Sequence, residues 1–381
     1  MSGFFSCTIL FLCYCYGKQR KDCAMNGEKN WLDHECTSWM VFDDLTGNNT
    51  HILHKNRDAE ERNIDVALSS AGSPRKWIAL GTDHTTNMGI NDSGLAGAMN
   101  SGEVYLDPTT DDTKKTTPAM LQVILESCDT AAQAVTKLQE LLDAKDYWHG
   151  NRGSIFFFLD RDGGYVCEIT AHVCNVLPCR NGYVVRANIW QNPGMQIHSR
   201  GNAKDHLHSS ARAYIACSGL NQMLDRDGKI TLPGIWELSR HCCMPEDTSE
   251  KNSVCNLKTN STATLEIDRQ YPGILSTGYF TIGAPRHTVY IPVPVCTESV
   301  LPEMGGSRWS EAAVRRYDEL GFDAPVPGEW LAFEAETLAV YSKAKEDARQ
   351  LLDKGRKEEA VALLNAAARD IWEKAAALLG L

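Results

Sequence analysis

The segments CTSWMVFD (residues 36–43) and THILHKNRD (residues 50–58) decide the fold that we predict for this chain of 381 residues. Both are apolar and rich in β-branched side chains, and the residues DDLTGNN at 43–49 favour a turn between them. We therefore predict a β-hairpin in which the end of the second strand lies beside the start of the first. This pairing brings Cys36 close to Asn56, Arg57 and Asp58, so Cys36 is a candidate nucleophile whose proton a carboxylate and a cation could manage.

A second predicted hairpin, at residues 87–102, is built of small side chains. Its tight turn begins at Asn91, and Asn100 lies near the end of its second strand. Glycine and alanine inside strands mark positions that another backbone or a ligand approaches closely. An ordinary hairpin of a sheet explains the same residues.

Two polar residues further along the chain are also candidates for a site. Asn188 ends a predicted strand at 182–188, where an amide N–H could stabilise an oxyanion, although such a residue is more often a turn former. Arg212 follows Ser209, which we expect to cap a helix. A cation in the first turn opposes the helix dipole, so Arg212 has either a functional role or an ordinary surface position.

The remaining pattern indicates alternating strands and helices. Residues 117–144 predict two helices separated near 127–129, with Asp129 or Thr130 capping the second. Strands are expected at 75–82, 154–159 and 165–169, at the edge strand 173–177, and at 182–188, which we expect to continue the same sheet. Residues 252–268 and 278–294 would form a second sheet, and 330–379 would form two long amphipathic helices.

Several of these motifs together resemble one family. Cys36, the run Lys55-Asn56-Arg57-Asp58, the pair Asn91 and Asn100, Asn188, and Ser210-x-Arg212 are similar in type and order to motifs of the N-terminal-nucleophile (Ntn) hydrolases. The nearest group is that of choloylglycine hydrolase, penicillin V acylase and isopenicillin-N acyltransferase, with its dipeptidase-like relatives. The resemblance implies an α+β fold, a four-layer αββα sandwich of two antiparallel sheets.

The resemblance also implies a domain organisation. Residues 1–35 would be an N-terminal extension or propeptide, 36–325 the catalytic domain, and 326–381 a C-terminal helical hairpin that packs on the domain or on a partner subunit. In this family the nucleophile is the first residue after processing, so everything up to Glu35 would have to be removed or never made.

The roles implied for single residues follow the family mechanism. The α-amino group of Cys36 would be the base, Asp58 would orient it, and Arg212 would favour the thiolate. The Asn188 side chain and the Asn100 backbone N–H would hold the oxyanion. Lys55, Asn56, Arg57 and Asn91 are the predicted substrate-binding residues. The bile-salt and penicillin members usually have arginine where this chain has Lys55, so either Lys55 or Arg57 could face Cys36.

Three functions are compatible with these residues. The first is a hydrolase or acyltransferase that acts on linear amide C–N bonds through an acyl-enzyme on Cys36, with a small-molecule amide or a short peptide as substrate. The second is a dipeptidase-like peptidase of the same fold. The third is a non-catalytic scaffold in which Cys36 remains internal. We predict no cofactor and no metal, because His241-Cys242-Cys243 and Cys174 with Cys179 lack the paired spacing of a zinc site.

Composition limits the partners and the compartment. The net charge of −11 argues against nucleic-acid binding, and we expect a homo-oligomer. The 14 cysteines are scattered and predicted to be mostly reduced core residues. The apolar stretch 3–16 is shorter than the roughly 20 residues that cross a bilayer. We therefore predict a cytoplasmic protein, or an exported or membrane-associated one if residues 1–24 act as a signal.

Overall fold

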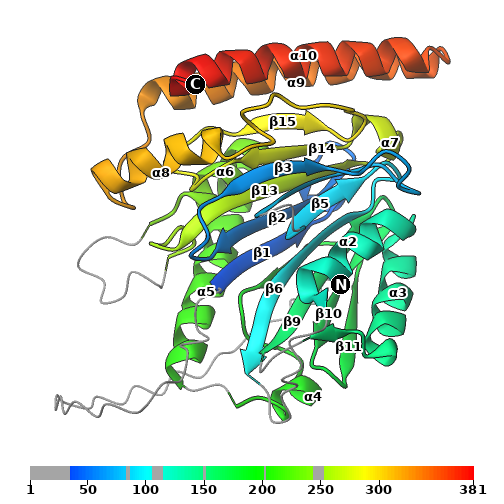
Figure 1. The fold of residues 1–381 in the computed structure, drawn as a ribbon, viewed down its shortest axis with the longest axis vertical. Helices are drawn as coiled ribbons and strands as arrows, with labels where there is room; N and C mark the ends of the chain where they lie inside the picture. The colour runs from blue at the N-terminus through cyan, green and yellow to red at the C-terminus, as the bar shows by residue number, and fades with distance from the viewer. Residues whose placement is uncertain (1–34, 83–85, 105–114, 149–151, 201–202, 243–252) are drawn as a thin grey trace. The chain divides into compact units, whose positions relative to one another are not determined.

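Two antiparallel sheets form the centre of the protein in a computed structural model that describes residues 35–82, 86–104, 115–148, 152–200, 203–242 and 253–381 (Figure 1). Sheet A has the order β12 (Tyr183–Arg186), β1 (Glu35–Val41), β2 (Thr50–Asp58), β13 (Thr259–Asp268), β14 (Thr277–Thr281) and β15 (Ile291–Pro294). Sheet B has the order β11 (Cys174–Cys179), β10 (Gly163–Ile169), β9 (Arg152–Asp160), β6 (Ala96–Val104), β5 (Met88–Asn91), β4 (Trp77–Thr82) and β3 (Ile64–Leu68). The short strands β7 (Lys115–Thr116) and β8 (Tyr147–Trp148) pair in parallel.

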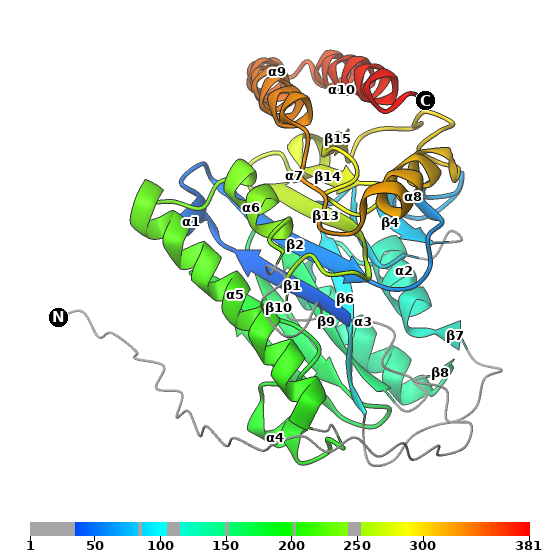
Figure 2. The same cartoon turned by 90° about the vertical axis from the view of Figure 1, so that its left-hand side faces the viewer.

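Helices cover the outer face of each sheet (Figure 2). On sheet B, α2 (Thr117–Ser127) and α3 (Ala131–Ala144) contact β5, β6, β9 and β10. On the side of sheet A lie α5 (Ala203–Asp227), α6 (Leu232–Ser239), α9 (Gly328–Asp353) and α10 (Lys357–Leu379). The remaining helices of the described residues are α1 (Asp43–Thr46), α4 (Pro193–Gln196), α7 (Pro272–Leu275) and α8 (Arg308–Leu320). The predicted αββα sandwich is thereby confirmed.

The hydrophobic core has two layers, which the run Phe156-Phe157-Phe158 on β9 illustrates. Successive side chains of a strand point to opposite faces. Phe157 accordingly packs in the core that includes Met40 and Leu53 of sheet A, whereas Phe156 and Phe158 pack in the cluster that contains α2 and α3. All residues of β1 and β2, the polar and charged ones included, are buried because both faces of sheet A are covered.

The structure corrects two predicted strand assignments. Strand β12 pairs with β1 in sheet A and does not continue the sheet that contains β11. Likewise, β13, β14 and β15 extend sheet A beyond β2, and residues 253–258 precede β13 without being part of it. The hairpin of β1 and β2 offers two open edges, and only long-range pairing determines which strands occupy them.

Other local predictions are confirmed. Helices α2 and α3 are separate, and the Thr130 side chain accepts a hydrogen bond from Gln133 N, so Thr130 caps α3. The small residues of the second hairpin make room for a helix, because a Cβ on Gly97 would lie 2.6 Å from Leu121 Cδ1 of α2. The close approach that this glycine indicates is therefore that of a neighbouring element of the fold.

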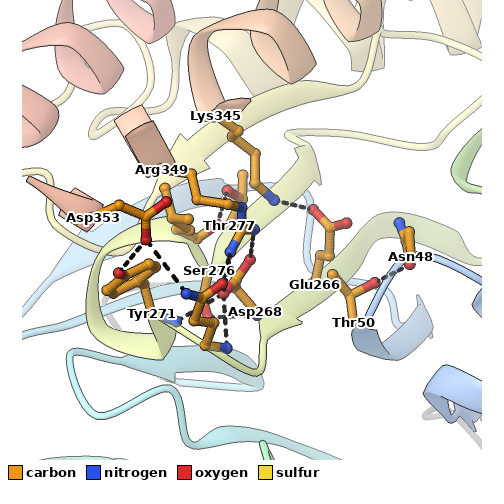
Figure 3. A network of polar contacts seen from close by, with 12 residues as sticks. Asn48, Thr50, Glu266, Asp268, Tyr271, Ser276, Thr277, Lys345, Arg349 and Asp353 are labelled. Atoms are coloured by element: carbon orange, nitrogen blue, oxygen red, sulfur yellow. Dashed lines mark hydrogen bonds and ion pairs between the residues drawn. The ribbon is translucent and has the colours of Figure 1, made fainter. Parts of the chain in front are cut away.

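Helix α9 is attached to the end of β13 and the adjoining turn by a ladder of ion pairs and hydrogen bonds (Figure 3). Its members are spaced by four residues and therefore share one helix face. The pairs are Lys345 Nζ with Glu266 Oε2 at 2.5 Å, Arg349 with Asp268, and Asp353 Oδ1 with the Tyr271 hydroxyl at 2.6 Å. Glu266 and Asp268 are buried, so the cations of α9 compensate their charge.

The predicted N-terminal extension lies outside the described residues except for Glu35. Among the helices that the structure describes, none combines the length and the apolar character needed to cross a membrane.

Candidate active site

The register between β1 and β2 separates the predicted site residues into two groups. Cys36 lies opposite Arg57, and Ser38 lies opposite Lys55. Directly opposed residues of an antiparallel pair point to the same face, so these four side chains share the face of sheet A that meets β6. The other face, toward α5 and α6, carries Glu35, Thr37, Asn56 and Asp58.

Lys55 is a basic side chain on the Cys36 face of the sheet. Its Nζ donates to Met99 O at 2.6 Å and to Asn100 Oδ1 at 3.0 Å, both on β6, and the Cys36 thiol lies close enough for its charge to act on the amine. Lys55 is 1% exposed, and this burial lowers its pKa from the ordinary value.

Arg57 turns its guanidinium partly outward. Its Nη2 donates to Glu61 Oε2 at 3.2 Å, whereas Nη1 is buried and has no hydrogen-bond partner within the described ranges. Arg57 thus lies on the same face as Cys36, and its Nη1 is a hydrogen-bond donor that a ligand could use.

Asn100 connects the two sheets beside Lys55. Its Oδ1 accepts from Lys55 Nζ and from Ser38 Oγ at 2.8 Å. Its Nδ2 donates to the carbonyls of Arg186 and Ala187 at 3.3 and 3.1 Å. These partners on both sides fix the orientation of the amide, because only the oxygen can face Lys55.

Asn188 and Arg212 meet the backbone of Cys36. Asn188 Oδ1 accepts from Cys36 N at 2.9 Å and from Arg212 Nη2 at 2.7 Å, and Asn188 Nδ2 donates to Ser101 O at 2.8 Å. Arg212 Nη1 also forms an ion pair with Glu35 Oε2 at 2.8 Å, and Arg212 is fully buried. The residue before Cys36 is therefore held by the same guanidinium that reaches the predicted oxyanion residue.

The position of Arg212 in its helix differs from the prediction. Helix α5 begins at Ala203, so Ser209 does not cap it and Arg212 lies within the helix. The upstream residues AKDHLH include good helix formers, which continue the helix in the N-terminal direction. Arg212 reaches the site from a middle turn of α5, away from the helix dipole.

Asp58 lies on the Glu35 face. Its Oδ1 accepts from Thr259 Oγ1 at 2.6 Å and its Oδ2 from Asn256 Nδ2 at 2.7 Å. Burial raises the pKa of Asp58 to about 7, although the nearby Arg212 and the two donors act in the opposite direction. The sequence pattern did not identify Asn256 and Thr259, which lie far downstream. Ser38 could have been identified from the sequence, because it lies two residues after Cys36 on the same predicted strand and therefore shares its face.

Two predicted substrate-binding residues have other contacts. Asn56 Nδ2 donates to the carbonyls of Ser239 and Val254, so it joins β2 to α6 on the face away from the Cys36 thiol. Asn91 Nδ2 donates to the carbonyls of Leu125 and Cys128, so it ties the hairpin turn to the end of α2. The structure therefore gathers Cys36, Lys55, Arg57, Asp58, Asn100, Asn188 and Arg212 but not Asn56 or Asn91.

A large cavity lies elsewhere in the described part of the chain. It has a volume of 760 Å³ and is lined by residues of α5, α6 and α9, among them Tyr214, Trp236 and Leu331. None of the predicted site residues lines it. Among the residues that the structure describes, no group of three or more His, Cys, Asp and Glu side chains is arranged to hold a metal ion.

No protein-family model matches this chain, and no curated protein matches its sequence. Similar solved structures include a mutant of conjugated bile acid hydrolase from Clostridium perfringens, with a TM-score of 0.48 and 13% identity over 69% of this chain and 93% of that one. Penicillin V acylase from Agrobacterium tumefaciens has a TM-score of 0.46 and 14% identity over 72% and 93%. The Caenorhabditis elegans ortholog of N-acylethanolamine-hydrolyzing acid amidase has 0.42 and 13% over 63% and 94%. All three are Ntn hydrolases, the group that the sequence motifs resemble, and at these identities the likeness concerns the fold alone.

Proposed function

We propose that this protein is a hydrolase of linear amide C–N bonds with Cys36 as its nucleophile. The observation that carries the proposal is the surroundings of Cys36 at the start of β1. An amine lies against its thiol, and Asn188 with Arg212 lies at its backbone nitrogen. Cleavage of the bond between Glu35 and Cys36 would convert this nitrogen into an α-amino group in the same place.

In the processed form the α-amino group is the base. Such a group titrates near 7.7–8.0 in reference peptides, so near neutral pH a useful fraction can accept the thiol proton. The thiolate attacks the amide carbonyl, and the α-amino group returns the proton to the leaving amine. Asn188 Oδ1, which already accepts from Cys36 N, holds the nitrogen, and Asp58, opposite Glu35, supplies a carboxylate beside it.

The oxyanion and the substrate are assigned to neighbouring groups. Asn188 Nδ2 and the Asn100 backbone N–H are the proposed oxyanion donors. Arg57 is the proposed substrate contact, since its buried Nη1 lies on the Cys36 face. Water resolves the acyl-enzyme in a hydrolase, including a dipeptidase-like enzyme that acts on short peptides, whereas a second amine would do so in an acyltransferase.

One observation favours the non-catalytic alternative. The uncleaved chain fits its surroundings, because Glu35 is paired with Arg212 and Cys36 N is hydrogen-bonded to Asn188 as a peptide nitrogen. A scaffold with an internal Cys36 would keep these contacts permanently.

The test compares the full chain with a chain that begins at Cys36, each beside its Cys36→Ala variant. Each protein is incubated with a panel of N-acyl amides and dipeptides, and intact mass reports any acyl group on the protein while chromatography reports the released amine. We expect amine release and an acyl adduct only from molecules whose chain begins at Cys36, whether they were made so or were cleaved during the incubation, and intact mass distinguishes them from the full chain. If neither form with Cys36 intact releases amine faster than its alanine variant, the amide hydrolase is excluded and the scaffold remains.

A further inference from the structure

Lys55 has an arrangement of partners that suits an uncharged amine. A neutral amine carries two N–H groups and one lone pair. Two of the partners of Nζ, Met99 O and Asn100 Oδ1, are pure acceptors at 2.6 and 3.0 Å. The Cys36 thiol, which shares the face of Lys55 and whose charge acts on the amine, can itself donate a proton.

The acceptors of Lys55 are fixed in their roles. A peptide carbonyl cannot donate, and the Asn100 amide cannot turn over without losing both bonds from its Nδ2 to the carbonyls of Arg186 and Ala187. Both hydrogens of a neutral Lys55 are therefore used, and its lone pair remains to accept a proton from the thiol on the same face.

The charges around Lys55 also favour an uncharged amine. Its two hydrogen-bond acceptors, Met99 O and Asn100 Oδ1, are not carboxylates, and the charged or titratable groups that act on it include Cys36, Arg57 and Asp58. The positive charge of Arg57 disfavours a charged Lys55, and Asp58 lies on the other face of β2. A buried ammonium needs an anion close by, and the thiolate of Cys36 is the group placed to provide it.

We propose that Lys55 is a catalytic base for Cys36 while Cys36 is still an internal residue, so that the uncleaved chain can cut itself before Cys36. The thiol gives its proton to the Lys55 amine, and the sulfur attacks the carbonyl carbon of Glu35. The C–N bond between Glu35 and Cys36 breaks as Lys55 returns the proton to the nitrogen. Water then hydrolyses the thioester, which releases the Glu35 carboxylate and restores the thiol beside a new α-amino group.

This role separates Lys55 from an arginine at the same position. A guanidinium remains charged at all accessible pH values, so it can stabilise a thiolate but cannot receive or return a proton. The lysine that this chain has where the related enzymes usually have arginine would then have a chemical consequence. Its amine can start the self-cleavage before the α-amino group of Cys36 exists.

The experiment follows two readouts on the uncleaved species, resolved by mass spectrometry. The first is the rate at which iodoacetamide alkylates Cys36 between pH 6 and 8, measured by peptide mapping with Cys36→Ala as the blank. The second is the rate of cleavage between Glu35 and Cys36. Lys55→Met, Lys55→Arg and Lys345→Met are compared with the parent chain; Lys345 lies on α9 and pairs with Glu266, so it is the matched control.

We expect the parent chain and the control to alkylate at nearly the same rate from pH 6 to 8 and to cleave. Lys55→Met should alkylate up to about 30-fold more slowly at pH 7, because an isolated thiol with a pKa near 8.5 is only about 3% ionised there. Lys55→Arg should alkylate like the parent chain but remain uncleaved.

Two outcomes overturn the inference. One is cleavage of Lys55→Arg at the parental rate. The other needs no variant and is therefore independent of folding: Cys36 in the uncleaved parent chain alkylates with the steep pH dependence of an isolated thiol. A chain that cleaves itself but hydrolyses no amide would refute the proposed function and leave the role of Lys55 standing.

Discussion

The raised pKa of Asp58 leads to a prediction about the stability of the fold that can be tested without any activity assay. Asp58 titrates near 7 in the folded chain and near the ordinary 3.8 when unfolded. The folded state therefore binds this proton more tightly. The stabilisation is complete below about pH 3.8 and is lost as the pH rises through about 7. The whole effect corresponds to roughly 4 kcal/mol at 1.36 kcal/mol for each pKa unit.

The perturbation is Asp58→Asn, which removes the titration and keeps an oxygen for Thr259 or Asn256. Relative to the parent chain, this variant should gain roughly 3 kcal/mol of unfolding free energy between pH 5 and 8, because the parent becomes less stable over this interval. The assay is urea unfolding followed by tryptophan fluorescence at several pH values. The Cys36→Ala background keeps the chain uncleaved, and Asp225→Asn, an exposed carboxylate on α5, controls for the change in net charge.

The refuting result is an Asp58→Asn variant whose stability changes with pH in parallel with the parent chain. It would mean that Asp58 is ionised throughout this range and that Arg212 and the two donors outweigh its burial. An Asp225→Asn variant with the same gain would assign the effect to net charge and not to the buried position.

Three further predictions concern contacts that stabilise the fold. Glu334→Ala should lower the free energy of unfolding in urea by about 3–5 kcal/mol, because the buried Arg240 guanidinium loses the carboxylate to which it donates two hydrogen bonds of 2.5 and 2.7 Å in the parent chain. A loss below about 1 kcal/mol would contradict this. Gly153→Ala should lower the melting temperature, since its Cβ would lie 2.2 Å from a backbone oxygen and 2.3 Å from a tryptophan ring, whereas Gly328→Ala, with nothing within 4 Å, should not; equal melting temperatures would count against the clash. Thr130→Ala should cost about 1 kcal/mol by removal of the α3 cap, and unchanged thermal unfolding would show that the cap is dispensable.

Sequence reasoning succeeded where the interactions are local. The hairpin of β1 and β2, the hairpin of β9 and β10, and the break between α2 and α3 are each set by residues close together in the chain. The two-sheet class followed from the motifs of the Cys36 region and the alternation of strands and helices. Strand order did not, because the edges of a hairpin can accept any strand that arrives with a suitable apolar face.

The same limit applies to the site. The observed register of β1 and β2 places both Lys55 and Arg57 on the Cys36 side, whereas the sequence left open which of the two faces Cys36. The position of the Lys55 amine depends on Asn100 and Met99, which belong to the other sheet. Asn56 and Asn91 are buried amides, and the partner of a buried amide is decided by whichever carbonyls the tertiary structure brings to it.

The contacts of Asp58 also have a consequence for the order of events during synthesis. Its hydrogen-bond donors, Asn256 and Thr259, lie 198 and 201 residues further along the chain. A nascent chain that ends before them can form the hairpin with Cys36 and Lys55 but leaves the carboxylate of Asp58 without these donors. The first half of the polypeptide therefore carries the reactive groups, and completion of the site waits until β13 has left the ribosome and paired with β2.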